Sequence, residues 1–157
     1  MRKLLSGGLI MVAAVSVPAA LSPHRIPEVA RHDYQKDPRL SPLQSFFRKM
    51  DCPAREYAVE FLTVADQYAL DWRLLPSLSF IESTCGKLGR NNNLFGWDSG
   101  RARFDSPNAA IRSVGSYLGS SELYRSKSLD KILATYNPNR DYAQKIKSVM
   151  RRISVVQ

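Results

Sequence analysis

A chain of 157 residues, 44% of them hydrophobic, has the length and composition of one globular domain with a buried core. Lysine and arginine total 23 against 14 acidic residues, and the net charge of +9 favours anionic partners. With two histidines and two cysteines in no ligand pattern, the sequence argues against a metal centre and implies no organic cofactor.

The N-terminus has the pattern of an export signal. Arg2 and Lys3 precede an uncharged apolar run, 4–17, and small residues follow it, which predicts a secretory signal peptide over 1–22. An uncleaved membrane anchor is the alternative, because residues 4–21 approach the minimum length of a spanning helix. We therefore expect an exported protein, periplasmic or secreted, which stays membrane-anchored only if the signal is uncleaved.

The segment after the signal differs in composition from the rest of the chain. Residues 23–40 contain three prolines among mixed charges and show no sustained periodicity, which predicts an extended linker. Both histidines, His24 and His32, lie in it and are expected to be solvated. The globular domain is therefore expected to cover 41–157.

From residue 41 onward, apolar residues recur at the spacing of amphipathic helices. Capping residues and early prolines mark where these helices begin. Residues 94–104 interrupt the helical period, and a turn at 98–100 separates two short segments suited to a β-hairpin. The predicted fold is mainly α with a small hairpin lobe. The expected helix starts lie near Ser41, Pro53, Asp71, Ser106, Ser128 and Asn139.

One acidic residue lies on an apolar helical stripe. Leu75, Leu78 and Glu82 share a face of a predicted helix, and Gly86 is expected to end that helix with a left-handed cap. The carboxylate would then stand at the rim of the core, where desolvation favours the protonated form that a general acid requires. A buried glutamate held by an arginine or by backbone donors fits the same pattern.

The segment 91–100 is rich in amide and aromatic side chains. Amides offer donors and acceptors to hydroxyl and acetamido groups, and aromatic rings offer flat faces to sugar rings. The sequence therefore predicts a carbohydrate cleft near Glu82 that is lined by Asn93, Phe95 and Trp97, although Phe95 is equally well placed for the core.

Cys52 and Cys85 are the only cysteines, and an even count in an exported protein favours a disulfide between them. The bond would tie the end of the Glu82 helix to the segment before the preceding helix. Two buried thiols are the alternative. No Cys-x-x-Cys spacing indicates thiol redox chemistry.

Short blocks follow one another along the chain at 82–83, 93–96, 103–106, 136–138 and 141–146. Their residues and order resemble the bacterial peptidoglycan N-acetylglucosaminidase family, which includes the muramidase-like domain of the flagellar rod-assembly protein. The resemblance implies a lysozyme-like fold, Glu82 as proton donor with Ser83 beside it at the substrate, and a catalytic role for Tyr136. The Asn137-Pro138 pair after Tyr136 departs from the family's usual continuation and is similar to lytic transglycosylases.

Hydrolysis of a glycosidic bond usually takes two carboxylates. Asp98 and Asp105, in or beside the expected hairpin, are the candidates for the second, although aspartate at such positions commonly holds a turn or a helix start. The resemblance therefore predicts a monomeric endo-β-N-acetylglucosaminidase that acts on peptidoglycan glycan strands. The alternatives are a lytic transglycosylase, which needs one glutamate, and a non-catalytic peptidoglycan-binding domain.

Charge adds a second class of expected partner. A basic exported domain is attracted to anionic envelope polymers such as teichoic acids and acidic lipids. Nucleic acid is not expected, because no nucleic-acid-binding motif is present and the export signal leads away from it.

Overall fold

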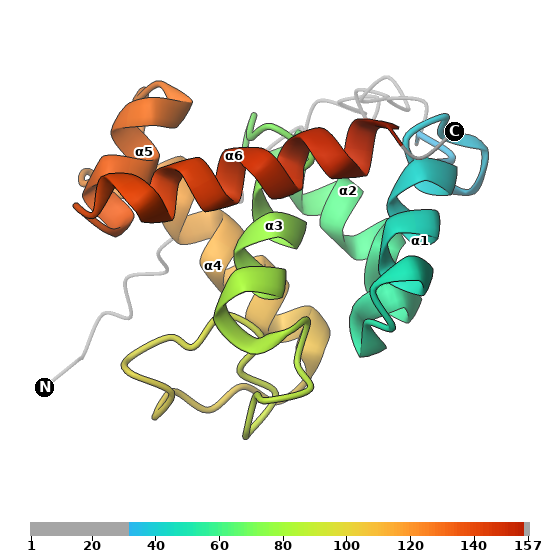
Figure 1. Ribbon diagram of the computed structural model, residues 1–157, viewed down its shortest axis with the longest axis horizontal. Helices are drawn as coiled ribbons and strands as arrows, with labels where there is room; N and C mark the ends of the chain where they lie inside the picture. Colours follow the sequence, from blue (N-terminus) through green and yellow to red (C-terminus); the bar gives the residue numbers. More distant parts are fainter. Residues whose placement is uncertain (1–31, 156–157) are drawn as a thin grey trace, which may run out of the picture. The chain divides into compact units, whose positions relative to one another are not determined.

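The structure of the protein, a computed structural model, describes residues 32–155, and the predicted signal peptide lies outside this range. The described chain is mainly helical, as predicted, and contains no strand (Figure 1). None of its helices is long and apolar enough to cross a bilayer. Its helices are η1 (Tyr34–Lys36), α1 (Leu40–Lys49), η2 (Pro53–Tyr57), α2 (Ala58–Gln67), α3 (Leu74–Ser83), α4 (Pro107–Ser120), α5 (Leu129–Tyr136) and α6 (Arg140–Val155), where η marks a 3-10 helix.

Helix α3 is buried along most of its length and ends at the candidate site. Its residues Leu74, Leu75 and Leu78 are at most 1% exposed. The helix packs against α2 and along α6, and α6, red in Figure 1, also contacts α1 and α5. Because apolar burial is the main driving force for folding, these contacts fix the direction in which α3 ends.

Helices α2 and α4 approach each other closely at a glycine. A Cβ atom on Gly115 would lie 2.1 Å from Cγ1 of Val64, far closer than two such atoms can come. Glycine inside a helix costs roughly 1 kcal/mol relative to alanine, but here it lets α4 settle on α2. This close contact fixes which side of α4 packs against α2, and the residues on the opposite side are exposed to solvent.

Several predicted helix starts are confirmed. The side chain of Ser106 accepts a backbone N–H from the first turn of α4 at 3.1 Å, and that of Asn139 does the same for α6 at 2.8 Å. The helix start predicted near Ser41 lies one residue earlier. Helix α1 already begins at Leu40, because the Leu40 N–H bonds to the carbonyl of Asp37 and starts the helical turn earlier.

The described part of the expected linker is folded rather than extended. Residues 34–36 form η1, and Asp37 is only 5% exposed. Arg39 Nη2 donates to Asp37 Oδ2 and to Asp66 Oδ2, each at 2.7 Å, and so ties this segment to α2. The His32 side chain is 54% exposed, as expected, and its Nε2 lies 2.6 Å from Asp37 Oδ2. Composition missed this fold because the anchoring partner, Asp66, is distant in sequence.

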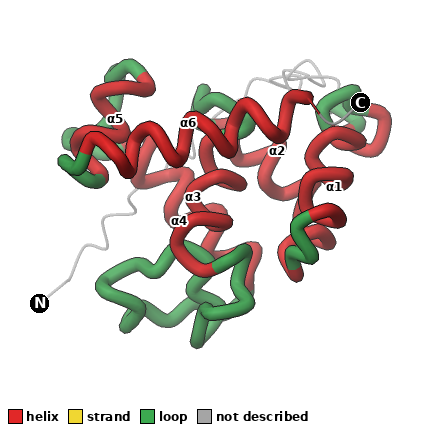
Figure 2. Tube along the Cα trace, viewed as in Figure 1, coloured by secondary structure: helices red, strands yellow, loops and turns green. Residues whose placement is uncertain are grey.

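The segment between α3 and α4, green in Figure 2, forms successive turns, and the predicted hairpin is wrong. Asp98, Ser99 and Gly100 all have positive φ, so the chain coils where a strand would extend. The N–H groups of residues 100–102 bond to carbonyls three to five residues earlier, and the Phe104 N–H bonds to the Asn91 carbonyl at 3.1 Å. The Asn93 amide takes the place of a partner strand, because it bonds both the N–H and the carbonyl of Trp97 at 2.9 Å.

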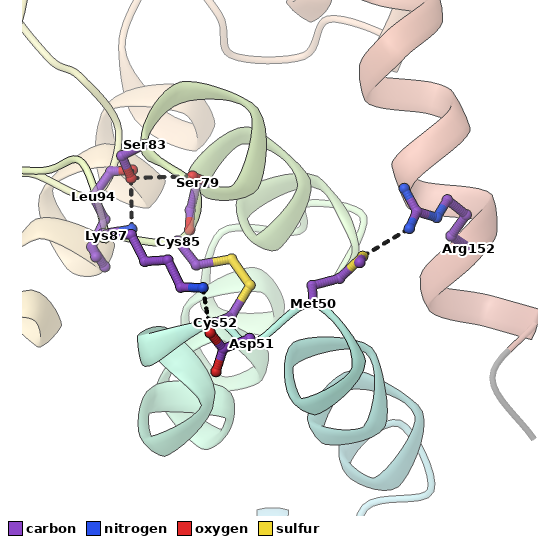
Figure 3. Close-up of a disulfide and its surroundings, with 10 residues drawn as sticks. Met50, Asp51, Cys52, Ser79, Ser83, Cys85, Lys87, Leu94 and Arg152 are labelled. Atoms are coloured by element: carbon purple, nitrogen blue, oxygen red, sulfur yellow. Dashed lines mark hydrogen bonds and ion pairs between the residues drawn. A yellow bond between two sulfur atoms is a disulfide. The ribbon is translucent and has the colours of Figure 1, made fainter.

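The predicted disulfide between Cys52 and Cys85 is confirmed (Figure 3). The two Cα atoms are 5.3 Å apart, and both residues are buried. Lys87 Nζ lies 2.5 Å from Asp51 Oδ2 beside the bond and joins the same two segments by an ion pair. The end of α3 is therefore held covalently to the connection between α1 and η2.

Candidate functional site

The last turn of α3 carries Glu82, and the helix ends at the next residue, Ser83. The chain then turns through 84–86, all of which have positive φ, so the left-handed cap predicted at Gly86 begins two residues earlier. The Ser83 hydroxyl accepts the Gly86 N–H at 2.7 Å. It also donates to the Leu94 carbonyl at 2.6 Å (Figure 3). These bonds fix the backbone immediately after Glu82 and hold its half-buried carboxylate at the rim of the core.

Tyr142 of α6 holds the Glu82 carboxylate. Its hydroxyl donates to Glu82 Oε1 at 2.5 Å, a short hydrogen bond to a charged group. Burial raises the pKa of Tyr142, and the hydrogen bond to Glu82 raises this pKa further, so the hydroxyl stays protonated and remains a donor. One carboxylate oxygen is thereby occupied, whereas Oε2 has no hydrogen-bond partner within residues 32–155.

Tyr136, at the end of α5, stacks on Tyr142. The ring centroids are 5.9 Å apart, and the ring planes differ by 10°. The Tyr136 hydroxyl donates to the Phe95 carbonyl through a long contact of 3.4 Å. Burial raises the pKa of Tyr136, and the negative charge of Glu82 raises it further. The structure therefore brings the predicted tyrosine into the site, where it supports Tyr142 and makes no hydrogen bond to the carboxylate itself.

A pocket of about 370 Å³ lies against Glu82, and we call it the Glu82 pocket. Gly96 borders it with a φ of 59°, and a Cβ there would lie 3.4 Å from Glu82 Oε2, so glycine keeps the space beside this oxygen open. Among the described residues, Glu82 is the only acidic one that lines this pocket, and Arg90 is the only basic one. The lining residues are Glu82, Ser83, Leu88, Gly89, Arg90, Asn93, Gly96, Ser99 and Gly100.

Three of the residues predicted to contact substrate have structural roles within the protein. The polar atoms of Ser83 and Asn93 are used within the protein, although both residues border the Glu82 pocket. Phe95 is 1% exposed, so its ring belongs to the core. Trp97 remains a candidate contact, since it is half-buried and its ring meets those of Tyr117 and Tyr136 edge to face.

The structure does not place either candidate second carboxylate in the Glu82 pocket. The Asp98 side chain is 56% exposed and pairs with Arg101 at 2.7 Å. Asp105 is exposed and lies just before the Ser106 cap of α4. Both aspartates therefore lie at a turn or a helix start, which was the alternative weighed for them from the sequence.

Sequence reasoning missed Tyr142 as the partner of Glu82. Tyr142 shares an apolar stripe with Ile146 and Val149 on α6, and such a stripe indicates core packing. Its place in the block 141–146 was the one signal that could have singled it out. The hydrogen bond spans 60 residues, and only the packing of α6 along α3 brings the two side chains together.

Neither a metal-binding group nor a comparison with known proteins assigns a further role to the described residues. Within residues 32–155, no group of three or more histidine, cysteine, aspartate or glutamate side chains is placed to hold a metal ion. Comparisons of the chain with protein-family models, with curated proteins and with solved structures found no match. Fold and pocket together define a mainly helical, disulfide-bonded domain with one tyrosine-held glutamate. The resemblance to N-acetylglucosaminidases stays a prediction from the sequence.

Proposed function

We propose that the protein is a peptidoglycan hydrolase of the endo-β-N-acetylglucosaminidase type, with a lysozyme-like fold and Glu82 as its proton donor. The observation that carries the proposal is the half-buried Glu82 carboxylate, which borders a pocket with one oxygen held by Tyr142 and the other unpaired. Such a carboxylate, fixed on a rigid helix beside space for a ligand, suits a general acid. The mainly helical fold is compatible with the lysozyme-like type.

The chemistry follows from the two oxygens of Glu82. Because Oε1 accepts from Tyr142, the unpaired Oε2 is the oxygen that takes up and then donates the proton. It passes to the glycosidic oxygen as the bond to the anomeric carbon breaks, and the leaving sugar departs as an alcohol. Since Glu82 is the only acidic residue that lines the pocket among those described, the 2-acetamido oxygen of the substrate attacks the anomeric carbon in place of a protein nucleophile. Water then opens the resulting ring, and a proton returns to Glu82.

The single acidic residue also supports a second candidate, a lytic transglycosylase. In that reaction a hydroxyl of the muramic sugar itself attacks the anomeric carbon, and its proton replaces the one that the glutamate donated. The product is an anhydro sugar end, and no second carboxylate is required. The two candidates share Glu82 and differ in the chemistry of their products.

The compartment and the charge fit a cell-wall substrate. A disulfide persists in an oxidising compartment, which agrees with the predicted export to the periplasm or the medium. The net charge of +9 favours binding to the anionic polymers and stem peptides of the envelope.

Mass spectrometry of digested peptidoglycan tests the proposal. Purified sacculi are incubated with the unmodified chain, with Glu82→Gln and with Glu122→Gln, whose carboxylate is 94% exposed and does not line the Glu82 pocket. Loss of a general acid costs roughly 10²-fold to 10⁴-fold in rate, so Glu82→Gln should be nearly inactive, whereas Glu122→Gln should match the unmodified chain. Circular dichroism checks that both variants are folded.

The new sugar ends decide between the candidates. Reducing N-acetylglucosamine ends support the glucosaminidase, and anhydro-N-acetylmuramic ends assign the protein to the lytic transglycosylases. No new ends, with the protein still sedimenting with the wall, would make it a peptidoglycan-binding domain. Full activity of Glu82→Gln would refute the role of Glu82 in either reaction.

A further inference from the structure

A second pocket, of about 380 Å³, lies between α4 and the loop that follows Trp97. Its volume falls within the range of about 300 to 1,000 Å³ that is common for small-ligand sites. None of its lining residues is charged, and none lines the Glu82 pocket. We call it the Tyr117 pocket, and it is lined by Trp97, Ala102, Phe104, Ser113, Val114 and Tyr117.

The lining combines aromatic rings with unpaired polar groups. Ser113 and Tyr117 lie one turn apart on the exposed side of α4, and Tyr117 is 41% exposed. The hydroxyls of both residues and the indole N–H of Trp97 have no hydrogen-bond partner within the described chain. A pyranose ring has the matching chemistry, because its C–H faces pack on aromatic rings while its hydroxyl and acetamido groups hydrogen-bond at the edge.

The pocket is linked to Glu82 through a chain of ring contacts. The rings of Tyr117 and Trp97 meet edge to face at 5.3 Å, and those of Trp97 and Tyr136 at 6.2 Å. Tyr136 stacks on Tyr142, which donates to Glu82. Because the two pockets share no lining residue, a sugar bound beside Tyr117 is a different unit from one held against Glu82.

We infer that the Tyr117 pocket binds one N-acetylated pyranose unit of a glycan chain, at a distance from the bond that is cleaved. The identity of the chain as peptidoglycan rests on the proposed function, whereas the sugar-binding chemistry rests on the pocket itself. Binding at such a subsite lengthens the stretch of glycan that the protein contacts. It therefore predicts tighter binding of long glycans than of short ones.

Tryptophan fluorescence tests this inference directly. The sequence has two tryptophans, so Trp72→Phe leaves Trp97, in the pocket wall, as the only tryptophan, which is excited selectively over tyrosine at long wavelength. The full chain with Trp72→Phe and Glu82→Gln is titrated with the N-acetylglucosamine tetramer, and saturable change in Trp97 emission is expected. Adding Tyr117→Ala should raise the Kd about fivefold or more, the scale of one lost aromatic contact, while Tyr117→Phe, which keeps the ring, should stay within about twofold.

A matched control separates binding from folding. Leu123→Ala removes another exposed apolar side chain, 48% exposed, and should leave the Kd unchanged. Thermal midpoints of all variants identify any that fail to fold. An unchanged Kd in Tyr117→Ala, an equal loss in Tyr117→Phe, or no saturable change in Trp97 emission would each overturn the inference.

The result of this binding test can be distinguished from the result of the peptidoglycan cleavage test of the proposed function. If the unmodified chain does not cleave peptidoglycan but the tetramer Kd depends on the Tyr117 ring, the subsite stands and the proposed function fails. If the chain cleaves peptidoglycan and Tyr117→Ala cleaves long strands equally well with the same KM, the proposed function stands and the subsite is overturned.

Discussion

Reducing the Cys52–Cys85 disulfide is expected to lower the free energy of unfolding substantially. The bond joins the end of α3 to the connection between α1 and η2, and it closes a loop with a sequence separation of 33. In the chain-entropy description, a loop of this length restricts the unfolded chain by about 3.7 kcal/mol. Because both sulfurs are buried, a reductant reaches them only when the protein opens locally or globally.

This free energy converts to a large thermal shift. A domain of this size has an unfolding entropy of about 0.26 kcal/mol/K, so the midpoint should fall by roughly 10 to 15 °C. Differential scanning calorimetry of the oxidised and the reduced protein measures the shift, and alkylation with mass analysis confirms the redox state of each sample.

A variant without the bond separates the loop effect from the reductant. Cys52→Ala combined with Cys85→Ala should unfold near the reduced protein, with a further small loss from the two truncated buried side chains. Adding reductant should not change this variant. Equal thermal midpoints for the oxidised and the reduced unmodified chain would refute the reasoning, because the disulfide would then make no contribution to the stability of the folded protein.

Two further predictions concern hydrogen-bonded carboxylates. Tyr142→Phe removes the donor to Glu82 Oε1 and should lower the rate of peptidoglycan cleavage roughly 10-fold to 150-fold, since hydrogen bonds to charged groups are worth about 1.5 to 3 kcal/mol. An unchanged rate, with Tyr68→Phe as the control, would contradict this prediction. Asp37→Asn should lower stability at pH 7 by about 2 kcal/mol in urea titrations. Hydrogen bonds from Arg39 hold the pKa of Asp37 below its ordinary value of 3.8, so this stability is present above that pH and is lost as the pH falls below it. The difference in free energy of unfolding between Asp37→Asn and the unmodified chain should therefore be smaller at pH 3 than at pH 7. An equal difference at both pH values would contradict the stabilising role of the Arg39–Asp37 hydrogen bonds.

Local features of the fold were predictable. The caps at Ser106 and Asn139 and the apolar stripe of α3 depend on residues within one or two turns of each other, so periodicity and capping chemistry located them. The disulfide was predictable because only one pairing exists for two cysteines. The hairpin was wrongly predicted, because residues 98–100 adopt positive φ and the side chain of Asn93, not a second strand, bonds Trp97.

Some features of the candidate site were likewise predictable from the sequence, and others were not. The position of Glu82 at the rim of the core followed from its place on an apolar stripe near a helix end, and the structure confirms that it lies in the last turn of α3. The groups that surround its carboxylate could not be predicted from the sequence. Ser83 and Asn93 were expected to contact a ligand, yet their polar atoms hold the loop, since backbone groups left over after α3 need partners.

The sequence by itself determined a mainly helical, disulfide-bonded chain with one glutamate at the end of a buried helix. These properties are encoded by neighbours along the chain, and local physics suffices to derive them. Only the tertiary structure decided that Tyr142 holds Glu82, that Asp98 and Asp105 lie outside the pocket, and that Tyr117 and Trp97 form a second pocket. Each of these depends on how α3, α4 and α6 and the loop after α3 pack, and packing joins side chains whose separation in sequence carries no signal of their contact.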